Sequence, residues 1–208
     1  MLDQATLLTY LAILFGFVFI PGPAVLLTLA RASTSGTRAG IATGLGIAVG
    51  DLIHTAMAVL GISAIMLASA FLFSLIKFMG AAYLVYLGIR AILEKAPSSQ
   101  NEKLVAITPG QAFRQGAIAE VLNPKSALFF LAFLPQFVTL ENGSVPLQLT
   151  TLGVLFVLVG LFSTLVFAVG AGSIGTFLRR HPSVLSWQGK VVGSIYCALG
   201  VRLALQER

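Results

Sequence analysis

Residues 19–54 read FIPGPAVLLTLARASTSGTRAGIATGLGIAVGDLIH, and this stretch decides the fold. Two apolar runs flank a short polar turn, and a Pro-Gly-Pro triplet breaks the first run. The second run is rich in glycine and contains an aspartate and a histidine. Apolar runs of roughly 20 residues match the thickness of a bilayer. The stretch therefore predicts two membrane-spanning helices, the first broken and the second carrying buried polar groups.

The composition of the whole chain also indicates a membrane protein. Of its 208 residues, 57% are hydrophobic and only 10% are charged. A soluble domain has roughly 25% charged residues, so this chain lacks the polar surface that water requires. The net charge of +6 does not indicate nucleic-acid binding, because the Lys and Arg residues are scattered between apolar runs. A single cysteine, Cys197, excludes a disulfide framework and a cysteine-based metal site.

The apolar runs predict an all-α integral membrane protein with six transmembrane helices. The expected spans are residues 5–30, 39–66, 69–93, 112–136, 146–174 and 188–205. A polar loop at 94–111 divides this single membrane domain into one repeat at 1–93 and a second at 112–208. Because each half has three spans, the halves enter the membrane from opposite sides. Inverted repeats of this kind are common in secondary transporters.

The basic residues predict how the chain is oriented. Nine of the Lys and Arg residues fall on one side of the expected topology, whereas only Arg202 and Arg208 fall on the other. Cytoplasmic loops carry an excess of Lys and Arg, so we expect both termini outside the cytoplasm in a bacterial inner membrane. The first span is expected to be retained, because Asp3 and no basic residue precede it.

Prolines break the first helix of each half: Pro21, Gly22 and Pro23 in one, and Pro124, after Asn123, in the other. Proline lacks an N–H and displaces the carbonyl four residues before it. The carbonyls of Phe17, Phe19 and Glu120 are therefore expected to lose their helical partners. Unpaired backbone groups are not tolerated against lipid. The two breaks therefore favour a solute cavity over a simple kink.

Ionisable side chains within the apolar runs form the candidate site. Asp51 and His54 lie on adjoining faces of the second span, and Glu120 and Lys125 bracket the break in the fourth. A charge at the membrane centre costs about 2.5–3.5 kcal/mol, so these groups should face the bundle interior or a wet cavity. We expect an ion pair between Asp51 and Lys125, direct or through water. Histidine titrates near neutral pH, so His54 either relays protons or is a hydrogen-bonded packing residue. Lys77, near a helix end, is expected to be structural.

Glycines are spaced along two of the expected spans. Gly40 and Gly44 with Ala48, and also Gly46 and Gly50, form small-residue stripes in the second span that let another helix approach closely. The sixth span has a similar set: Gly189, Gly193 and Gly200. This second set serves either packing within the chain or a homodimer.

Residues 19–54 resemble the amino-terminal signature of the LysE/RhtB family of amino-acid exporters. Residues 113–137, FRQGAIAEVLNPKSALFFLAFLPQF, resemble the NPK segment and PQF ending of that family. The resemblance covers nearly the whole chain and implies export of amino acids or close derivatives from the cytoplasm in exchange for protons. It extends to these family positions: Pro21, Gly22, Pro23, Asp51, Asn123, Pro124 and Lys125. Glu120 departs from the family, since many relatives have an uncharged polar residue there, and the substrate is therefore not inferred from any relative.

These observations together predict a gradient-driven secondary transporter for amino acids with protons as the coupling ion. The expected substrate-binding or proton-coupling residues are Asp51, His54, Glu120, Asn123 and Lys125. The substrate ammonium would meet Asp51 or Glu120, and its carboxylate would meet Lys125 or the start of a half-helix. No catalytic motif, nucleotide-binding loop or Cys/His cluster is present in the sequence, so we expect no enzyme activity, cofactor or metal. The alternatives are a transporter of another small solute or ion, and a membrane scaffold or intramembrane enzyme.

Overall fold

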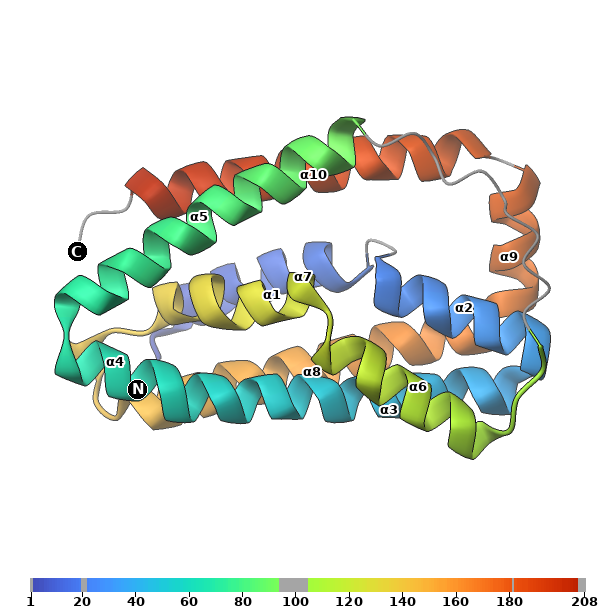
Figure 1. The fold of residues 1–208 in the computed structure, drawn as a ribbon, viewed down its shortest axis with the longest axis horizontal. Helices are drawn as coiled ribbons and strands as arrows, with labels where there is room; N and C mark the ends of the chain where they lie inside the picture. Colours follow the sequence, from blue (N-terminus) through green and yellow to red (C-terminus); the bar gives the residue numbers. More distant parts are fainter. Residues whose placement is uncertain (1, 20–21, 94–104, 181, 206–208) are drawn as a thin grey trace.

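The computed structural model describes residues 2–19, 22–93, 105–180 and 182–205, and the regular elements in these ranges are all helical. The prediction of an all-α membrane protein is confirmed. The helices lie mainly along one long axis, with both chain ends at one end of the molecule and α9 at the other (Figure 1). The elements are α1 (Gln4–Phe19), α2 (Pro23–Ser35), α3 (Thr37–Met57), η1 (Ala58–Ile62), α4 (Ser63–Ala68), α5 (Ala70–Leu93), α6 (Pro109–Val121), α7 (Pro124–Leu128), η2 (Phe129–Phe133), η3 (Leu134–Phe137), η4 (Leu140–Asn142), α8 (Val145–Val169), α9 (Ala171–Arg180) and α10 (Pro182–Leu205).

Several of these helices are long and apolar enough to cross a membrane. Within the described residues, three pass this test by length and composition: 37–65, 74–93 and 145–169. Two bent pairs, α1 with α2 and α6 with the segment from α7 to η3, raise the number to five if each pair forms one span. The sixth predicted span corresponds to α10, which is not among them. The six-span arrangement in two inverted repeats therefore stays a prediction.

Both predicted helix breaks are present. The chain bends by 46° between α1 and α2 and by 45° between α6 and α7. Pro23 and Pro124 each occupy the first turn of the helix that follows the break, where a missing N–H costs no hydrogen bond. Asn123 caps α7, because its side-chain oxygen accepts a hydrogen bond of 3.0 Å from the Lys125 backbone N–H. Pro21 lies outside the described residues.

Some helix boundaries differ from the predicted ones. The helix expected to begin at residue 112 begins at Pro109, because Thr108 and Gln111 form a capping box around its first turn. The span expected at 146–174 ends as α8 at Val169, and the short helix α9 follows. For the helix that begins at Pro109, this proline and the polar residues near it indicated a loop in the sequence, although proline is also favoured at the first position of a helix.

Glycine allows α3 to lie very close to its neighbours. A Cβ atom on Gly46 would fall 2.1 Å from the carbonyl oxygen of Phe113 in α6, and one on Gly44 would fall 2.7 Å from Thr164 Oγ1 in α8. Gly116 of α6 faces the Thr43 carbonyl in the same way. The predicted small-residue stripe therefore packs on two sides, against α6 and α8.

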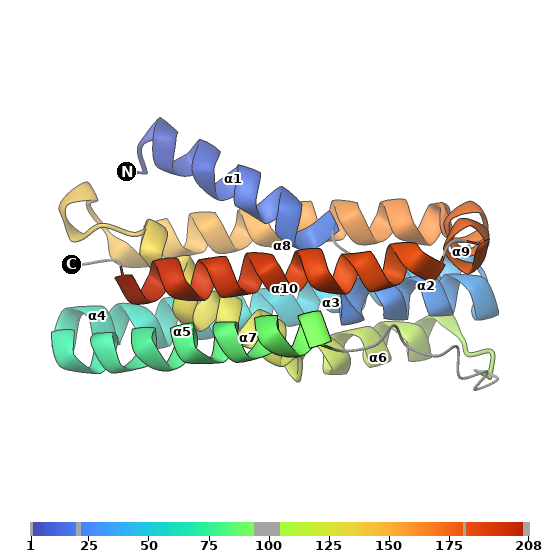
Figure 2. The same cartoon turned by 90° about the horizontal axis from the view of Figure 1, so that it is seen from above.

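Helices α5 and α10 lie side by side along much of their length (Figure 2). Gly88 of α5 and Gly193 of α10 meet backbone to backbone, and Gly200 lies against the Ala81 carbonyl. Gly193 and Gly200 thus serve packing within the chain, while the surroundings of Gly189 lie outside the description. An aromatic core that includes Tyr10, Phe129, Phe130 and Phe156 fills the bundle between α1, η2 and α8.

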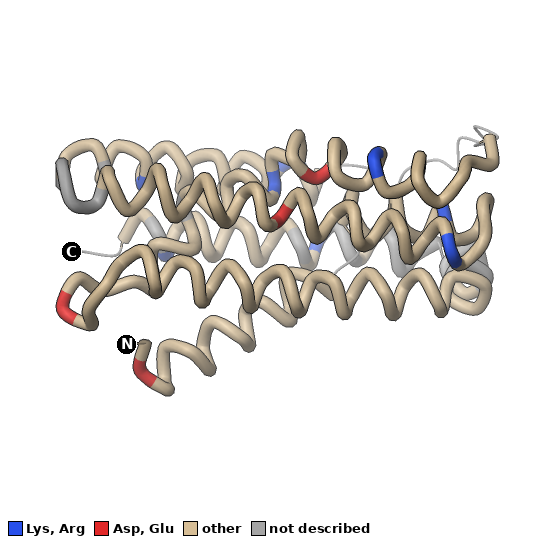
Figure 3. The backbone as a smooth tube through the Cα atoms, turned by 90° about the horizontal axis from the view of Figure 1, so that it is seen from below, with Lys and Arg blue, Asp and Glu red and all other residues tan. Residues whose placement is uncertain are grey.

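Acidic residues lie near the end of the molecule that contains the termini, where Arg202 in the last turn of α10 also lies, and basic residues lie near the opposite end (Figure 3). Asp3 precedes α1 and Glu141 lies in η4, at the end that contains the termini, whereas Arg31 and Arg38 flank the turn between α2 and α3 at the opposite end. Asp3 accepts hydrogen bonds from the Thr6 N–H and hydroxyl at 2.8 and 2.7 Å, which hold the pKa of its carboxyl below the ordinary value. Large apolar side chains cover much of the remaining exterior, which suits contact with lipid.

Candidate functional site

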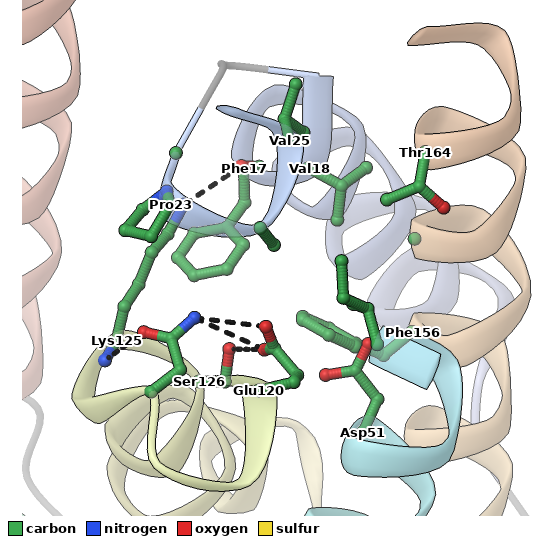
Figure 4. Close-up of a pocket in the computed structure, with 15 residues that line it drawn as sticks. Phe17, Val18, Pro23, Val25, Asp51, Glu120, Lys125, Ser126, Phe156 and Thr164 are labelled. Carbon is green, nitrogen blue, oxygen red and sulfur yellow. Dashed lines mark hydrogen bonds between the residues drawn. The ribbon is translucent and has the colours of Figure 1, made fainter. Parts of the chain in front are cut away.

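A small cavity lies where the two helix breaks meet the middle of α3 and α8 (Figure 4). Its volume is about 50 Å³, which is room for a few water molecules. The lining residues come from both halves of the chain: Phe17, Val18, Gly22, Pro23, Ala24, Val25, Ile47, Asp51, Glu120, Asn123, Lys125, Ser126, Phe156, Gly160 and Thr164. The cavity therefore brings together four of the five predicted substrate-binding or proton-coupling residues, and the fifth, His54, contacts the backbone of Glu120.

Glu120 is the most heavily hydrogen-bonded acid of the cavity. Only 3% of the residue is exposed. Asn123 donates from its amide to both carboxylate oxygens, at 3.3 and 3.2 Å, and the Ser126 hydroxyl donates to Oε1. These donors come from the turn at Pro124, so the helix break itself orients the carboxylate. Three hydrogen bonds compensate for much of the water that Glu120 loses on burial.

Asp51 reaches the cavity from α3 and is only 2% exposed. Its carboxyl group lies near that of Glu120, and the two point toward each other (Figure 4). Among the described residues, no group donates a hydrogen bond to Asp51 Oδ1. A buried polar atom without a partner is costly and is commonly explained by a ligand, a water molecule or an ion. Asp51 is thus an acceptor that is open to a donor entering the cavity.

Lys125 lies on the opposite side of Glu120 from Asp51 (Figure 4). Its ammonium nitrogen lies 4.1 Å from the centre of the Phe17 ring and 5.7 Å from that of Tyr196. The nitrogen also donates to the Phe17 carbonyl at 3.5 Å. An ammonium group held over aromatic faces is attracted by the negative charge of the ring faces. Within the part of the chain that the structure describes, Lys125 therefore contacts two aromatic rings and a carbonyl and is not paired with a carboxylate.

Of the two forms predicted for the Asp51–Lys125 ion pair, the direct one is wrong for this structure, and the one through water stays a prediction. Within the described contacts, Lys125 binds the Phe17 ring and carbonyl, while Asp51 faces Glu120. The reason is geometric: Glu120 lies between the two residues because Gly50 lets its side chain approach α3, where a Cβ atom would fall 2.6 Å from Glu120 Cβ. The site is a chain of three ionisable groups rather than an isolated pair.

Side chains replace the helical partners that the prolines remove. Lys125 donates to the Phe17 carbonyl, and Ser163 of α8 donates to the neighbouring Val18 carbonyl at 2.9 Å. His54 Nε2 lies 3.0 Å from the Glu120 carbonyl, and since a carbonyl only accepts, this nitrogen carries the hydrogen. The loss of helical partners predicted for Phe17 and Glu120 is thus compensated from other helices. Phe19 directly precedes residues that the structure does not describe.

His54 combines its hydrogen bond with a packing contact. Its ring is stacked on Phe130, with the ring centres 5.6 Å apart and the planes inclined by 16°. Both interactions hold the ring in place on the outer side of the turn at Glu120. This geometry supports α3 against α6.

Several contributors to the site were not identified in the sequence. Ser126 follows Lys125 directly, so the first turn of α7 could have suggested it. Gly160 borders Asp51 from α8, and Phe17 supplies the ring beneath Lys125. These two residues belong to apolar runs in which nothing distinguishes them from residues that face lipid.

Arg31 is one of the nine basic residues counted above for the orientation of the chain, and the structure gives it a packing role as well. It is buried, and its guanidinium donates from Nε to Gln115 Oε1 at 2.7 Å and from Nη1 to the Val105 carbonyl at 3.1 Å. Ser35 nearby accepts from the Ile107 N–H at 3.1 Å. Arg31 therefore ties α2, which follows the first break, to α6, which precedes the second.

The chain is similar in sequence to several known membrane proteins. An uncharacterized membrane protein of Bacillus subtilis, YrhP, is 31% identical over 211 residues, which cover 96% of this chain and 99% of that protein. An uncharacterized membrane protein of Vibrio cholerae is 29% identical, with 98% of each chain covered. The leucine efflux protein of Salmonella typhimurium is 25% identical, covering 94% of this chain and 93% of that protein. No solved structure matches the chain.

The family comparison covers almost the entire sequence. Residues 15–207 match the family described as LysE type translocator. This range contains both helix breaks and every residue that lines the cavity. A translocator moves a solute across a membrane and is not an enzyme, which is in keeping with a cavity enclosed by membrane-spanning helices. The chain belongs to the LysE type translocator family.

Proposed function

We propose that this protein exports amino acids from the cytoplasm in exchange for protons, using the cavity at the two helix breaks as its substrate site. The observation that carries the proposal is the buried, unpartnered Oδ1 of Asp51 in a cavity that also contains Lys125. An acceptor and a cation within one cavity match the two ends of a zwitterion. The relative from Salmonella typhimurium is named a leucine efflux protein, which supports the same substrate class.

The ammonium group of the substrate binds between Asp51 and Glu120. Asp51 offers Oδ1, and the negative charge of Glu120 lies beside it. The carboxylate binds Lys125, whose ammonium contacts, among the described residues, two aromatic rings and the Phe17 carbonyl at 3.5 Å. Charge-assisted hydrogen bonds of this kind are roughly twice as strong as neutral ones. The cavity of about 50 Å³ is too small for the substrate, so binding requires the two halves to move apart.

Proton coupling follows from the charges of the same three groups. Two carboxylates and one ammonium give the empty site a net charge of −1 when all are ionised. A proton and a substrate ammonium are therefore alternative partners for the carboxyl pair. A proton that arrives from outside on Asp51 or Glu120 weakens the hold on the substrate and favours its release. Departure of that proton to the cytoplasm restores the acceptor for the next substrate.

The broken helices provide the movable parts. In secondary transporters, discontinuous helices at a repeat interface line the substrate site, and rocking of one repeat against the other changes its access. Bends of 46° and 45° adjoin the cavity here. Both termini lie at the end opposite Arg31 and Arg38, and the excess of basic residues in cytoplasmic loops supports an orientation with the termini outside the cytoplasm of a bacterial inner membrane.

Counterflow in proteoliposomes tests this function. Vesicles containing the purified protein are loaded with unlabelled leucine, and uptake of labelled leucine is followed with and without a pH gradient. We expect exchange above that of protein-free vesicles, and net efflux that becomes faster when the outside is acidic. Net efflux that is indifferent to the gradient would eliminate the proton step. The absence of exchange for every amino acid tested would eliminate the function itself.

A further inference from the structure

The cavity has an apolar wall beside its charged groups. Val18 and Val25 lie on the side away from Asp51 and Glu120, and Phe156 closes the flank (Figure 4). Ile47 of α3 completes the wall. Val25, Ile47 and Phe156 are buried within the protein and face no lipid. A substrate held by its ammonium and carboxylate at the charged side would therefore direct its side chain against apolar surface.

The charged groups that line the cavity favour a substrate whose side chain is neutral. Among the described lining residues, the ionisable groups are Asp51, Glu120 and Lys125. The substrate ammonium, or the exchanged proton in its place, engages the two carboxyl groups, and the substrate carboxylate engages Lys125. A cationic or anionic side chain would bring a further charge into the apolar wall with no partner, and an unpaired buried charge is strongly unfavourable.

We infer that this transporter selects neutral amino acids with apolar side chains and that Gly160 sets the size of side chain it accepts. The inference rests on the proposed function, since it assumes that the cavity is the amino-acid site. Gly160 borders the cavity from α8, one helical turn after Phe156 of the apolar wall and on the same face of the helix. A Cβ atom built on Gly160 would have one neighbour within 4 Å, Asp51 Oδ2 at 3.6 Å.

That distance makes Gly160 a suitable position to test. A contact of 3.6 Å is ordinary van der Waals separation, so Gly160→Ala adds a methyl group without displacing Asp51. Alanine is also a better helix former than glycine. The methyl group projects from the cavity wall that the substrate contacts once the two halves have moved apart, so the variant should fold normally and exclude larger substrates. In apolar pockets one methylene changes discrimination roughly 10- to 200-fold.

The experiment measures counterflow of a panel of labelled amino acids in proteoliposomes. The panel contains leucine, alanine, lysine and glutamate, which represent a large apolar, a small apolar, a cationic and an anionic side chain. For the unmodified protein we expect exchange of leucine and alanine, with lysine and glutamate at the level of empty vesicles. For Gly160→Ala the ratio of leucine to alanine exchange should fall about tenfold. Gly16→Ala is the matched control, because its added methyl would meet nothing within 4 Å.

Each outcome decides a separate point. Exchange of lysine or glutamate at the rate of leucine would overturn the substrate class while leaving the amino-acid exporter intact. An unchanged ratio of leucine to alanine in Gly160→Ala would remove Gly160 as the size determinant. Exchange of none of the four amino acids would refute the proposed function, and with it the inference that depends on that function.

Discussion

Replacing Asp51 by Asn separates a functional role from a structural one, because the two roles predict opposite effects on stability. Asp51 contributes an unpartnered carboxylate oxygen, and its other neighbour across the cavity is the carboxyl of Glu120. Asn has nearly the same shape, but its amide can donate to Glu120. A hydrogen bond to a charged group contributes about 1.5–3 kcal/mol. Asp51→Asn should therefore leave the thermal stability of the protein unchanged or raise it.

Transport should change in the other direction. The substrate ammonium loses a charge-assisted partner, which is also worth about 1.5–3 kcal/mol. Since 1.4 kcal/mol corresponds to a factor of ten, substrate affinity should fall roughly 10- to 150-fold. Counterflow of labelled leucine in proteoliposomes measures the loss, and thermal unfolding of the detergent-solubilised protein measures stability. The exposed carboxylate of Glu141 in η4 provides the control, since Glu141→Gln makes the same chemical change away from the cavity.

The reasoning fails if Asp51→Asn unfolds at a lower temperature and transports leucine normally. That result would make Asp51 a structural residue with partners that the closed cavity does not reveal. Loss of both stability and transport would also contradict it, because Asp51→Asn would then not relieve the repulsion between the two facing carboxyl groups.

Three further substitutions test the packing and the site. Gly46→Ala should lower stability by about 1–3 kcal/mol in thermal unfolding, because the new Cβ would fall 2.1 Å from the Phe113 carbonyl oxygen; equal stability would refute the close α3–α6 contact. Arg31→Ala should lower the unfolding temperature more than substitution of an exposed surface arginine, since it leaves the Gln115 side chain and a backbone carbonyl unpaired; equal effects would show that the tie contributes nothing. Lys125→Met should preserve folding and reduce leucine counterflow at least tenfold, and unchanged counterflow would remove the lysine from substrate binding.

The helix breaks and the ionisable residues could be predicted from the sequence because their physical cause is local. A proline removes its own N–H wherever it lies, so the bends at Pro23 and Pro124 followed directly. A charged residue in an apolar run is costly against lipid, so Asp51, Glu120 and Lys125 had to face inward. The structure places all three in one cavity.

The partners of those residues could not be predicted in the same way. The sequence favoured a pair between Asp51 and Lys125, yet Glu120 lies between them because Gly50 lets it approach α3. From the sequence, Arg31 counted only as one of the basic residues that orient the chain, although it is buried against α6. In both cases the outcome depends on how closely two helices approach, and residue order does not specify that distance.

The sequence by itself determined that this chain lies in a membrane, where its helices break and which side chains are too costly to expose to lipid. These properties depend on composition, on proline geometry and on the solvation of single groups, and each can be assessed one segment at a time. Only the tertiary structure decided which acceptor remains open, which aromatic ring holds the lysine and which glycine borders the cavity. Those properties arise from contacts between helices that are distant in the chain. Glycine determines these contacts, because it lets the helix backbones lie close together.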